Sequence, residues 1–260
     1  MTTYIMDIEA NHLLQDVTKV WCVVMRNADA DEVHTFNPDE IEASLEFMNK
    51  AEYLVGHNLI DYDLRVLKKL YGWDYKGKVI DTLVCTRTIW PHIGELDSKS
   101  RNLPQKLRGS HSLKAWGFRL GELKGDFNTG GESFEIYTPE MLTYCIQDTA
   151  CTKVLYDKIK AKNFSQDALD LEHRLHTLLV RQQEAGFPFH VEKAQKLHAT
   201  LEGRRSEIHT QLVDTFEPTI IEMKTKTKVL PFNPASRPQI ADRLMKRGWV
   251  PTSFTPTNEP

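Results

Sequence analysis

Cysteine is scarce in this sequence, and long apolar segments are missing. The 260 residues include four cysteines, Cys22, Cys85, Cys145 and Cys151, and no two of them form a C-x-x-C pair. This usage excludes a disulfide scaffold and leads us to expect a reducing cytoplasm. No apolar run approaches the roughly 20 residues that span a bilayer, so we expect no membrane partner.

Net charge is also small, because 33 Lys plus Arg stand against 36 Asp plus Glu, which gives −3. The charges are nevertheless segregated along the chain. Residues 1–60 carry 3 basic and 11 acidic side chains, whereas residues 61–130 carry 13 and 8. Solvated helix faces would explain this clustering as well as a nucleic-acid partner would. The positions of individual carboxylates have to decide between these explanations.

The first part of the chain reads as a mixed sheet with helices. Three strand-like runs at 3–8, 19–25 and 33–36 are followed by alternating helix and strand patterns, which predicts an α/β domain. Beyond about residue 163 only helical patterns continue, and half of the 12 prolines fall from Pro231 onward. We therefore expect an α/β domain followed by a helical module with little core of its own.

Two carboxylates share one face of the first predicted strand. Side chains alternate along a strand, so Asp7 and Glu9 point the same way, about 7 Å apart. Two like charges beside a core are unfavourable unless a cation neutralises them, and carboxylate oxygens suit Mg²⁺ or Mn²⁺. A sheet face turned to water is the alternative explanation for this pair.

A third carboxylate lies in the middle of a helical pattern that runs from Pro139 to about Lys160. Asp148 falls on an apolar stripe with Cys145, so it needs a partner there. Tyr144 is four residues earlier and therefore lies on the same face, one turn away. A structural hydrogen bond in the core would also explain such a buried Asp.

A further acidic segment, from His57 to Asp63, stands where a predicted buried strand meets a helix. Asp61 is suited to cap that helix. Asp63 falls in its first turn, where the helix dipole favours a carboxylate. Capping alone would therefore account for both acids.

The three segments in combination resemble the DEDD superfamily of 3′–5′ exonucleases, in its tyrosine-containing branch. The matching pattern is a strand D-x-E, an N-x-x-x-x-D that begins at Asn58, and a late helix Y-x-x-x-D. The resemblance implies a ribonuclease H-like fold in which Tyr144 orients the attacking water. It also implies two divalent cations, Mg²⁺ or Mn²⁺, held by Asp7, Glu9, Asp63 and Asp148.

Two positions bear on the branch and on the third ligand. In the histidine branch a His stands five residues before the last Asp, and here that position is Thr143. The family pattern places a Tyr or Phe directly before the third ligand. Tyr62 precedes Asp63, so Asp61 is the less favoured rival for that role.

Longer matches extend the resemblance over nearly the whole chain. Four segments look like the proofreading domain of family-A DNA polymerases of short-tailed, T-seven-like phages; they lie at 7–11, 80–84, 109–117 and 144–148. Segments 183–189 and 232–237 look like the start of the thumb in the same enzymes. The implied domains are a 3′–5′ exonuclease domain at 1–163 and an incomplete helical start of the thumb at 164–260.

The resemblance implies a metal-dependent 3′–5′ DNA exonuclease that proofreads for a phage polymerase in the cytoplasm of an infected bacterium. The expected partners are a single-stranded DNA 3′ end, primer–template DNA, and the polymerase palm and fingers in cis or in trans. No palm or fingers sequence occurs in the 260 residues, so we expect no polymerisation by this chain. We also expect no thioredoxin binding, because only a short segment separates Phe216 from Phe232, where thioredoxin-recruiting polymerases carry a large insertion.

Three other functions are compatible with the same patterns. The chain could be a separately encoded exonuclease subunit, an RNA-trimming exonuclease of the same superfamily, or a non-catalytic module that positions DNA. The presence of all four acidic positions together with Tyr144 argues against the non-catalytic module.

The basic part of the chain is suited to hold a DNA backbone. The residues predicted to bind nucleic acid are Asn58, Lys68, Lys69, Arg101, Lys106 and Arg108. A solvated charge is the alternative for each basic residue. His173 and His176 have no partner pair at metal-ligand spacing, so we expect them on a helix surface.

Overall fold

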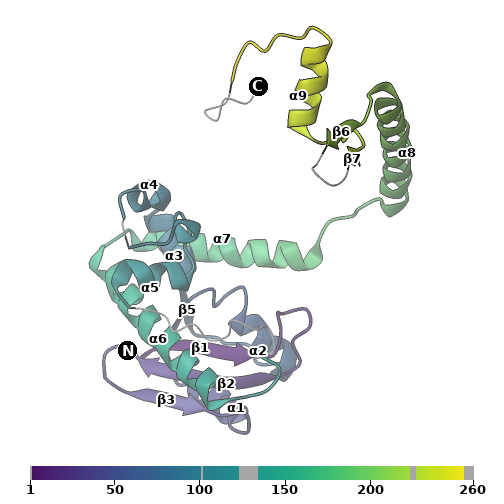
Figure 1. The fold of residues 1–260 in the computed structure, drawn as a ribbon. Helices are drawn as coiled ribbons and strands as arrows, with labels where there is room; N and C mark the ends of the chain where they lie inside the picture. The colour runs from purple at the N-terminus through teal and green to yellow at the C-terminus, as the bar shows by residue number, and fades with distance from the viewer. Residues whose placement is uncertain (1, 101, 123–133, 223–226, 255–260) are drawn as a thin grey trace. The chain divides into compact units, whose positions relative to one another are not determined.

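The computed structural model describes residues 2–100, 102–122, 134–222 and 227–254. The chain divides into two compact units, Met1–Gly186 and Phe187–Pro260. Figure 1 shows the elements of each unit. Among the residues described, no helix combines the length and apolar character needed to cross a membrane.

A mixed five-stranded sheet forms the centre of the first unit (Figure 1). Its strands, in chain order, are β1 (Thr3–Ala10), β2 (Val20–Asn27), β3 (Val33–Phe36), β4 (Tyr53–Gly56) and β5 (Lys78–Asp81). Their order in the sheet is β3-β2-β1-β4-β5. β1 pairs antiparallel with β2 and parallel with β4, and β4 pairs parallel with β5. Mixed pairing within one sheet confirms the predicted α/β class.

Helices cover both faces of this sheet. The helices described in the first unit are α1 (Ile41–Met48), α2 (Asp63–Tyr71), α3 (Thr82–Ile89), α4 (Ile93–Asp97), α5 (Leu113–Leu120), α6 (Pro139–Ala161) and α7 (Gln166–Ala185), with a 3-10 turn η1 (Gln105–Leu107). Met6 and Ile8 of β1 face the core formed with α1 and α2. Cys22 and Val24 of β2 pack instead against Cys145 of α6. Because side chains alternate, Asp7 and Glu9 point to the side covered by α6.

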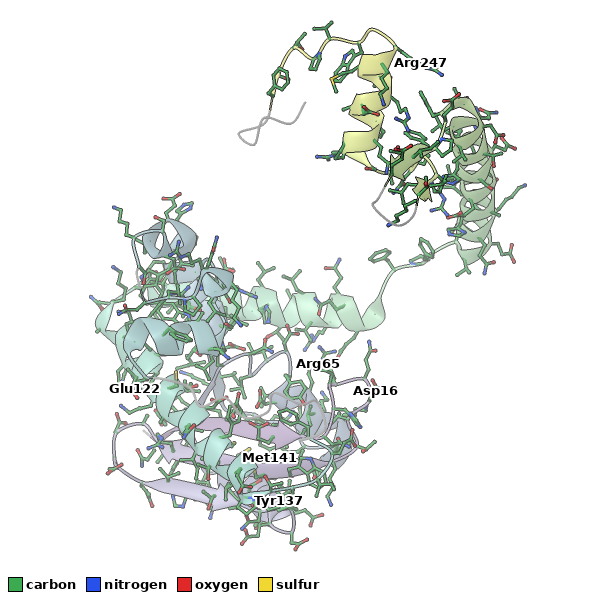
Figure 2. All side chains as sticks on the ribbon, viewed as in Figure 1. Asp16, Arg65, Glu122, Tyr137, Met141 and Arg247 are labelled. Carbon is green, nitrogen blue, oxygen red and sulfur yellow. The ribbon has the colours of Figure 1, made fainter. Side chains whose placement is uncertain are left out.

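The start of α6 is fixed by its own sequence. The Thr138 hydroxyl accepts a hydrogen bond from the Met141 N–H at 3.3 Å, and Pro139 occupies the first turn, where its missing N–H costs nothing. Figure 2 labels Tyr137 and Met141 here, beside the sheet. Tyr137 packs on the β2 cluster and Met141 is fully buried. The buried face of α6 is therefore held against β1 and β2.

The compact first unit extends past the predicted boundary at residue 163. Leu169 of α7 is buried in a cluster with Cys85 of α3 and Leu155 of α6, and α7 runs alongside α3. The division between the units consequently falls after Gly186. The assignment of 164–260 to a thumb stays a prediction.

The second unit contains α8 (Val191–Thr215), β6 (Thr219–Glu222), β7 (Thr227–Leu230) and α9 (Arg237–Lys246). β6 and β7 form an antiparallel hairpin in which Ile220 pairs with Val229. The expectation of helices alone beyond residue 163 was therefore wrong here. Both strands are short and rich in β-branched residues, which favour extended backbone.

Candidate metal centre

Two carboxylates and one thiol meet where α6 crosses β1. One ligand atom each of Asp7, Glu9 and Cys145 lies within 4.8 Å of the others. Cys145 donates its thiol hydrogen toward Asp7, with Sγ at 3.4 Å from the backbone O and 3.5 Å from Oδ2. The sequence pattern indicates for Cys145 only a place in the apolar stripe of its helix. Its contact with Asp7 depends on the packing of α6 against the sheet.

The carboxylate of Asp63 contacts the same stretch of β1. It is the first residue of α2, is only 4 % exposed, and accepts a hydrogen bond at Oδ1 from the Ile8 N–H at 3.3 Å. Ile8 is the residue between Asp7 and Glu9. Burial raises the pKa of Asp63 above its usual range, and the neighbouring charge of Asp81 raises it further. The carboxylate is therefore placed where its ionised form needs a positive partner.

The pKa of the Tyr62 hydroxyl depends on burial and on the acidic residues of this region. Its hydroxyl donates to the His12 carbonyl at 2.7 Å. Burial raises the pKa of Tyr62 to about 12, with further contributions from the charges of Asp63, Glu9 and Asp7. Three of the four predicted ligands therefore lie near enough to this phenol to disfavour its ionised form.

The fourth predicted ligand lies on α6. Asp148 is only 4 % exposed, three residues after the Cys145 thiol that contacts Asp7. Tyr144 is half-buried one turn before Asp148. Because residues three and four apart share a helix face, the face that meets β1 carries the predicted ligand and the predicted water-orienting hydroxyl.

These residues fit a divalent cation. Asp7, Glu9, Asp63 and Asp148 would offer hard oxygen ligands from three segments. All but the half-buried Asp7 are buried, so their negative charges call for a positive partner. The Cys145 thiol lies in the same cluster. Burial, its hydrogen bond with Cys22 and the nearby Asp7 raise the pKa of Cys145 well above its usual range, so in the metal-free protein the thiol is protonated and acts as a hydrogen-bond donor.

The rival carboxylate Asp61 is engaged elsewhere. Its Oδ1 lies 3.4 Å from Arg65 Nη1, and its Oδ2 lies 3.6 Å from His176 Nε2. The geometry therefore favours Asp63 over Asp61 as the third acid of the cluster. The same contact shows that His176, expected at the surface, faces the segment that leads into α2.

The predicted DNA-binding residues occupy varied settings. The Lys69 ammonium donates to the carbonyls of Leu14 and Gln15 at 2.9 and 2.7 Å, and Lys68 pairs with Asp74 at 3.2 Å. Both lysines thus hold protein groups.

The remaining residues of that set lie further along the chain or in the turn before α2. Lys106 and Arg108 are exposed on and after η1, although Arg108 also donates to the Ser100 carbonyl at 3.1 Å. Asn58 donates its backbone N–H to Asp81. Arg101 lies outside the described residues.

Sequence comparison connects the chain to two phage enzymes. It is 28 % identical to the DNA-directed DNA polymerases of Enterobacteria phage T3 and Escherichia phage T7, over 98 % of its length in each case. This similarity confirms the resemblance indicated by the motifs. The chain spans about half the length of these relatives, 51 % of each. No protein-family model matches the sequence.

Solved structures with a similar backbone include two further proteins. The catalytic core of RRP6 from Trypanosoma brucei aligns with a TM-score of 0.48 at 18 % identity, covering 69 % of this chain and 46 % of that one. NrnC of Brucella melitensis aligns with a TM-score of 0.46 at 14 % identity, covering 71 % and 86 %.

Proposed function

We propose that this chain is the metal-dependent 3′–5′ exonuclease part of a phage family-A DNA polymerase and removes nucleotides from a single-stranded primer end. The observation that carries the proposal is the cluster of Asp7 and Glu9 with Cys145 of α6, next to the Ile8 N–H that Asp63 accepts. The same α6 face bears Tyr144 and Asp148. The sequence similarity to two phage DNA polymerases supports the polymerase context.

The reaction is hydrolysis of the last phosphodiester bond. Water adds to the phosphorus of the terminal nucleotide, the bond from phosphorus to the O3′ of the preceding nucleotide breaks, and that oxygen takes up a proton. The products are a nucleoside 5′-monophosphate and a strand shortened by one nucleotide. Two divalent cations, Mg²⁺ or Mn²⁺, when bound, lower the pKa of the water and offset negative charge on the leaving oxygen.

Each residue of the site has a distinct part in this chemistry. Asp7, Glu9, Asp63 and Asp148 would hold the cations. The Tyr144 hydroxyl would orient the attacking water, because it stands on the same helix face as Asp148. The Cys145 thiol keeps the Asp7 carboxylate in place through the hydrogen bond to Oδ2.

The substrate would approach as a single strand. Four carboxylates repel a phosphate backbone, so binding needs the cations and basic groups outside the cluster. The exposed Lys106 and Arg108 are suited to that role. A primer–template duplex and the palm and fingers of the polymerase, in cis or in trans, complete the proposed set of partners.

The proposal is tested with single-stranded oligonucleotides labelled at the 3′ or the 5′ end, in Mg²⁺ or Mn²⁺. The wild-type chain should release labelled mononucleotide from the 3′ label at once and shorten the 5′-labelled strand stepwise. The Asp7→Ala, Glu9→Ala double variant should lose this activity. Asp39→Ala with Glu46→Ala, which removes two exposed carboxylates, is the matched control and should keep it.

Two of the alternative functions predict different outcomes in this assay. Faster digestion of a matched RNA strand would favour an RNA-trimming enzyme. Binding of the 3′ end without metal-stimulated cleavage would favour a positioning module. Equal activity of wild type and the Asp7→Ala, Glu9→Ala variant would contradict the assignment of the site.

A further inference from the structure

The carboxylate of Asp81 lies at the junction of β5 and α3, with no exposed surface. Its Oδ1 accepts the Leu83 N–H at 2.9 Å and so caps α3. A cap needs only this one bond. The same side chain also accepts the N–H of Asn58 at Oδ1 and the N–H of Ile60 at Oδ2, both at 3.0 Å.

The two additional bonds reach a turn with a left-handed residue. Asn58 has a φ of 69°, in a region that asparagine adopts more readily than most residues other than glycine. The turn continues as the Tyr62 N–H donates to the Asn58 carbonyl at 3.1 Å, and the Leu64 N–H donates to the Leu59 carbonyl at 3.1 Å. The Asp81 carboxylate thus holds the turn from which α2 begins.

Asp63 is the first residue of α2, the helix that follows this turn. Its carboxylate reaches Ile8 of β1, so a small shift of the turn would move Asp63 away from Asp7 and Glu9. Asp81 itself is at the end of β5, paired with Gly56 at the end of β4. The parallel sheet therefore fixes the position of Asp81, and Asp81 fixes the turn.

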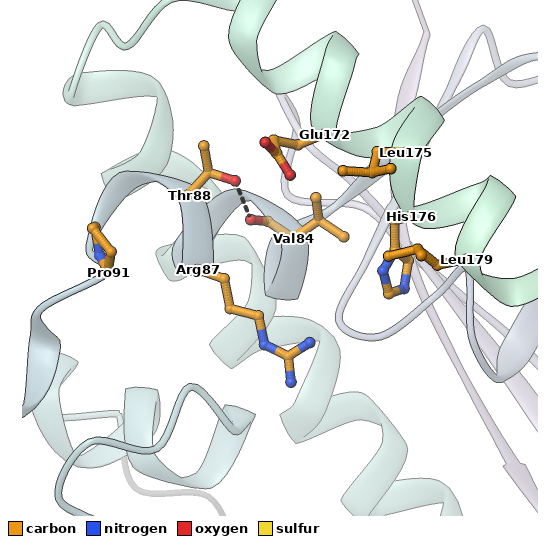
Figure 3. Close-up of a pocket in the computed structure, with 8 residues that line it drawn as sticks. All are labelled: Val84, Arg87, Thr88, Pro91, Glu172, Leu175, His176 and Leu179. Atoms are coloured by element: carbon orange, nitrogen blue, oxygen red, sulfur yellow. Dashed lines mark hydrogen bonds between the residues drawn. The ribbon is translucent and has the colours of Figure 1, made fainter.

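Asp81 itself is held by α7, a helix that lies beyond the predicted domain boundary at residue 163. The Asp81 N–H donates to His173 Nε2 of α7 at 2.8 Å, and His173 Nδ1 lies 2.7 Å from the Leu169 carbonyl. The Nδ1–H tautomer satisfies both contacts. One turn further along, His176 and its neighbours Leu175 and Leu179 face α3 across a groove of about 350 Å³ (Figure 3).

We propose that Asp81 is a positioning residue for the metal centre: by holding the Asn58–Ile60 turn, it sets the place of the Asp63 carboxylate beside Asp7 and Glu9. This inference rests on the proposed function through the role of Asp63 as a ligand. It assigns to α7 a part in the site, because His173 holds the Asp81 backbone.

Two variants of the full chain separate positioning from simple electrostatics. Asp81→Asn keeps the shape of the side chain but removes its charge. One carboxylate oxygen is replaced by an NH₂ group, which cannot accept a hydrogen bond from the backbone N–H groups. Asp81→Glu keeps the charge but lengthens the side chain by one methylene and displaces the acceptors. Ser112→Ala, which removes the side-chain cap of α5, controls for the loss of a helix cap alone.

Mn²⁺ affinity and amide hydrogen exchange are the readouts, with thermal denaturation to verify folding. We expect both Asp81 variants to weaken Mn²⁺ binding about tenfold and to speed exchange of the Asn58 and Ile60 amides, while Ser112→Ala changes neither. Nuclease activity of both variants should recover at high Mn²⁺. Weakened binding in Asp81→Asn alone would mean that only the charge matters and would overturn the proposal, as would unchanged exchange at Asn58 and Ile60.

The proposed function can fail independently of this inference. A wild-type chain that binds Mn²⁺ but cuts no DNA would contradict the exonuclease assignment. Amide hydrogen exchange and Mn²⁺ affinity of the Asp81 variants would still test the role of Asp81. A wild-type chain that binds no Mn²⁺ would overturn both.

Discussion

Cys145 donates its thiol hydrogen to the Asp7 carboxylate, with 3.5 Å between Sγ and Oδ2, across 138 positions of sequence. The bond ties α6 to β1 beside Tyr144, the proposed water-orienting residue. It is one of the contacts that join the helix carrying Asp148 to the strand carrying Asp7 and Glu9.

Replacing the Cys145 thiol tests this connection. Cys145→Ser keeps a donor of similar size, whereas Cys145→Val fills the space without one. We expect Cys145→Val to raise the Mn²⁺ concentration for half-maximal nuclease activity about tenfold, and Cys145→Ser to stay closer to wild type. Titration of the initial rate with Mn²⁺ measures this, and identical titration curves for the two variants would contradict a role for the hydrogen bond.

Tyr144 and Asp148 should separate into different kinetic roles. Tyr144→Phe removes only a hydroxyl, so the maximal cleavage rate should fall roughly 100-fold with little change in Mn²⁺ affinity. Asp148→Asn removes the charge of a proposed ligand, so Mn²⁺ affinity should fall as well. Rates at saturating Mn²⁺ combined with direct binding measurements decide, and the assignment fails if Tyr144→Phe acts on affinity alone.

The raised pKa of Asp63 predicts a pH-dependent stability of the metal-free protein. Burial, followed by the charge of Asp81, raises this pKa, so the folded state holds the proton more tightly than the unfolded state. The stability linked to that proton is fully present below the ordinary carboxylate pKa and is lost as the pH rises through the raised value.

Asp63→Asn removes this titration while keeping the shape of the side chain. In EDTA the variant should therefore melt at a higher temperature than wild type at alkaline pH, and the difference should shrink as the pH falls. Mn²⁺ should stabilise the wild type more than the variant. Parallel pH profiles of the two melting temperatures would show that Asp63 ionises in the folded protein without cost.

Packing of α7 on the first unit predicts unequal effects of two neighbouring leucines. Leu169 is 8 % exposed and Leu171 is 55 % exposed. Leu169→Ala should lower the free energy of unfolding by about 2–4 kcal/mol, whereas Leu171→Ala should change it by less than about 0.5 kcal/mol. Urea denaturation of the full chain measures both, and a harmless Leu169→Ala would argue that α7 is dispensable for the first unit.

Salt dependence distinguishes the lysines that hold protein groups from those available to DNA. Lys106→Ala should reduce the slope of log affinity against log salt by about 0.7, the value for one contact to a single strand. Lys69→Met should leave that slope unchanged, because its ammonium already serves the carbonyls of Leu14 and Gln15. A reduced slope in Lys69→Met would return that residue to the DNA-binding set.

The sequence predicted those helices and strands that are specified by residues close together in the chain. The strand Val33–Phe36 agrees with the expected one, and α6 begins at Pro139 as its capping residues indicate. The shared face of Asp7 and Glu9 follows from the period of a strand. Short strands with mixed polarity give a weaker pattern, which is why the β6–β7 hairpin was missed.

Contacts between distant segments could not be predicted in the same way. The bonds from Asn58 and Ile60 to Asp81 require β4 and β5 to be neighbours in the sheet. The position of His173 against Asp81 requires α7 to fold back along α3. One residue did carry a local indication, since Asp81 stands directly before a helix, where an Asp is a common cap.

The most direct measurement counts Mn²⁺ ions bound per chain in the presence of a phosphorothioate single strand that resists cleavage, by electron paramagnetic resonance. Wild type and the Asp39→Ala, Glu46→Ala control should each bind two ions tightly. The Asp7→Ala, Glu9→Ala variant should lose both ions. The same number of ions in all three proteins, or none in the wild type, would contradict a metal centre built on β1.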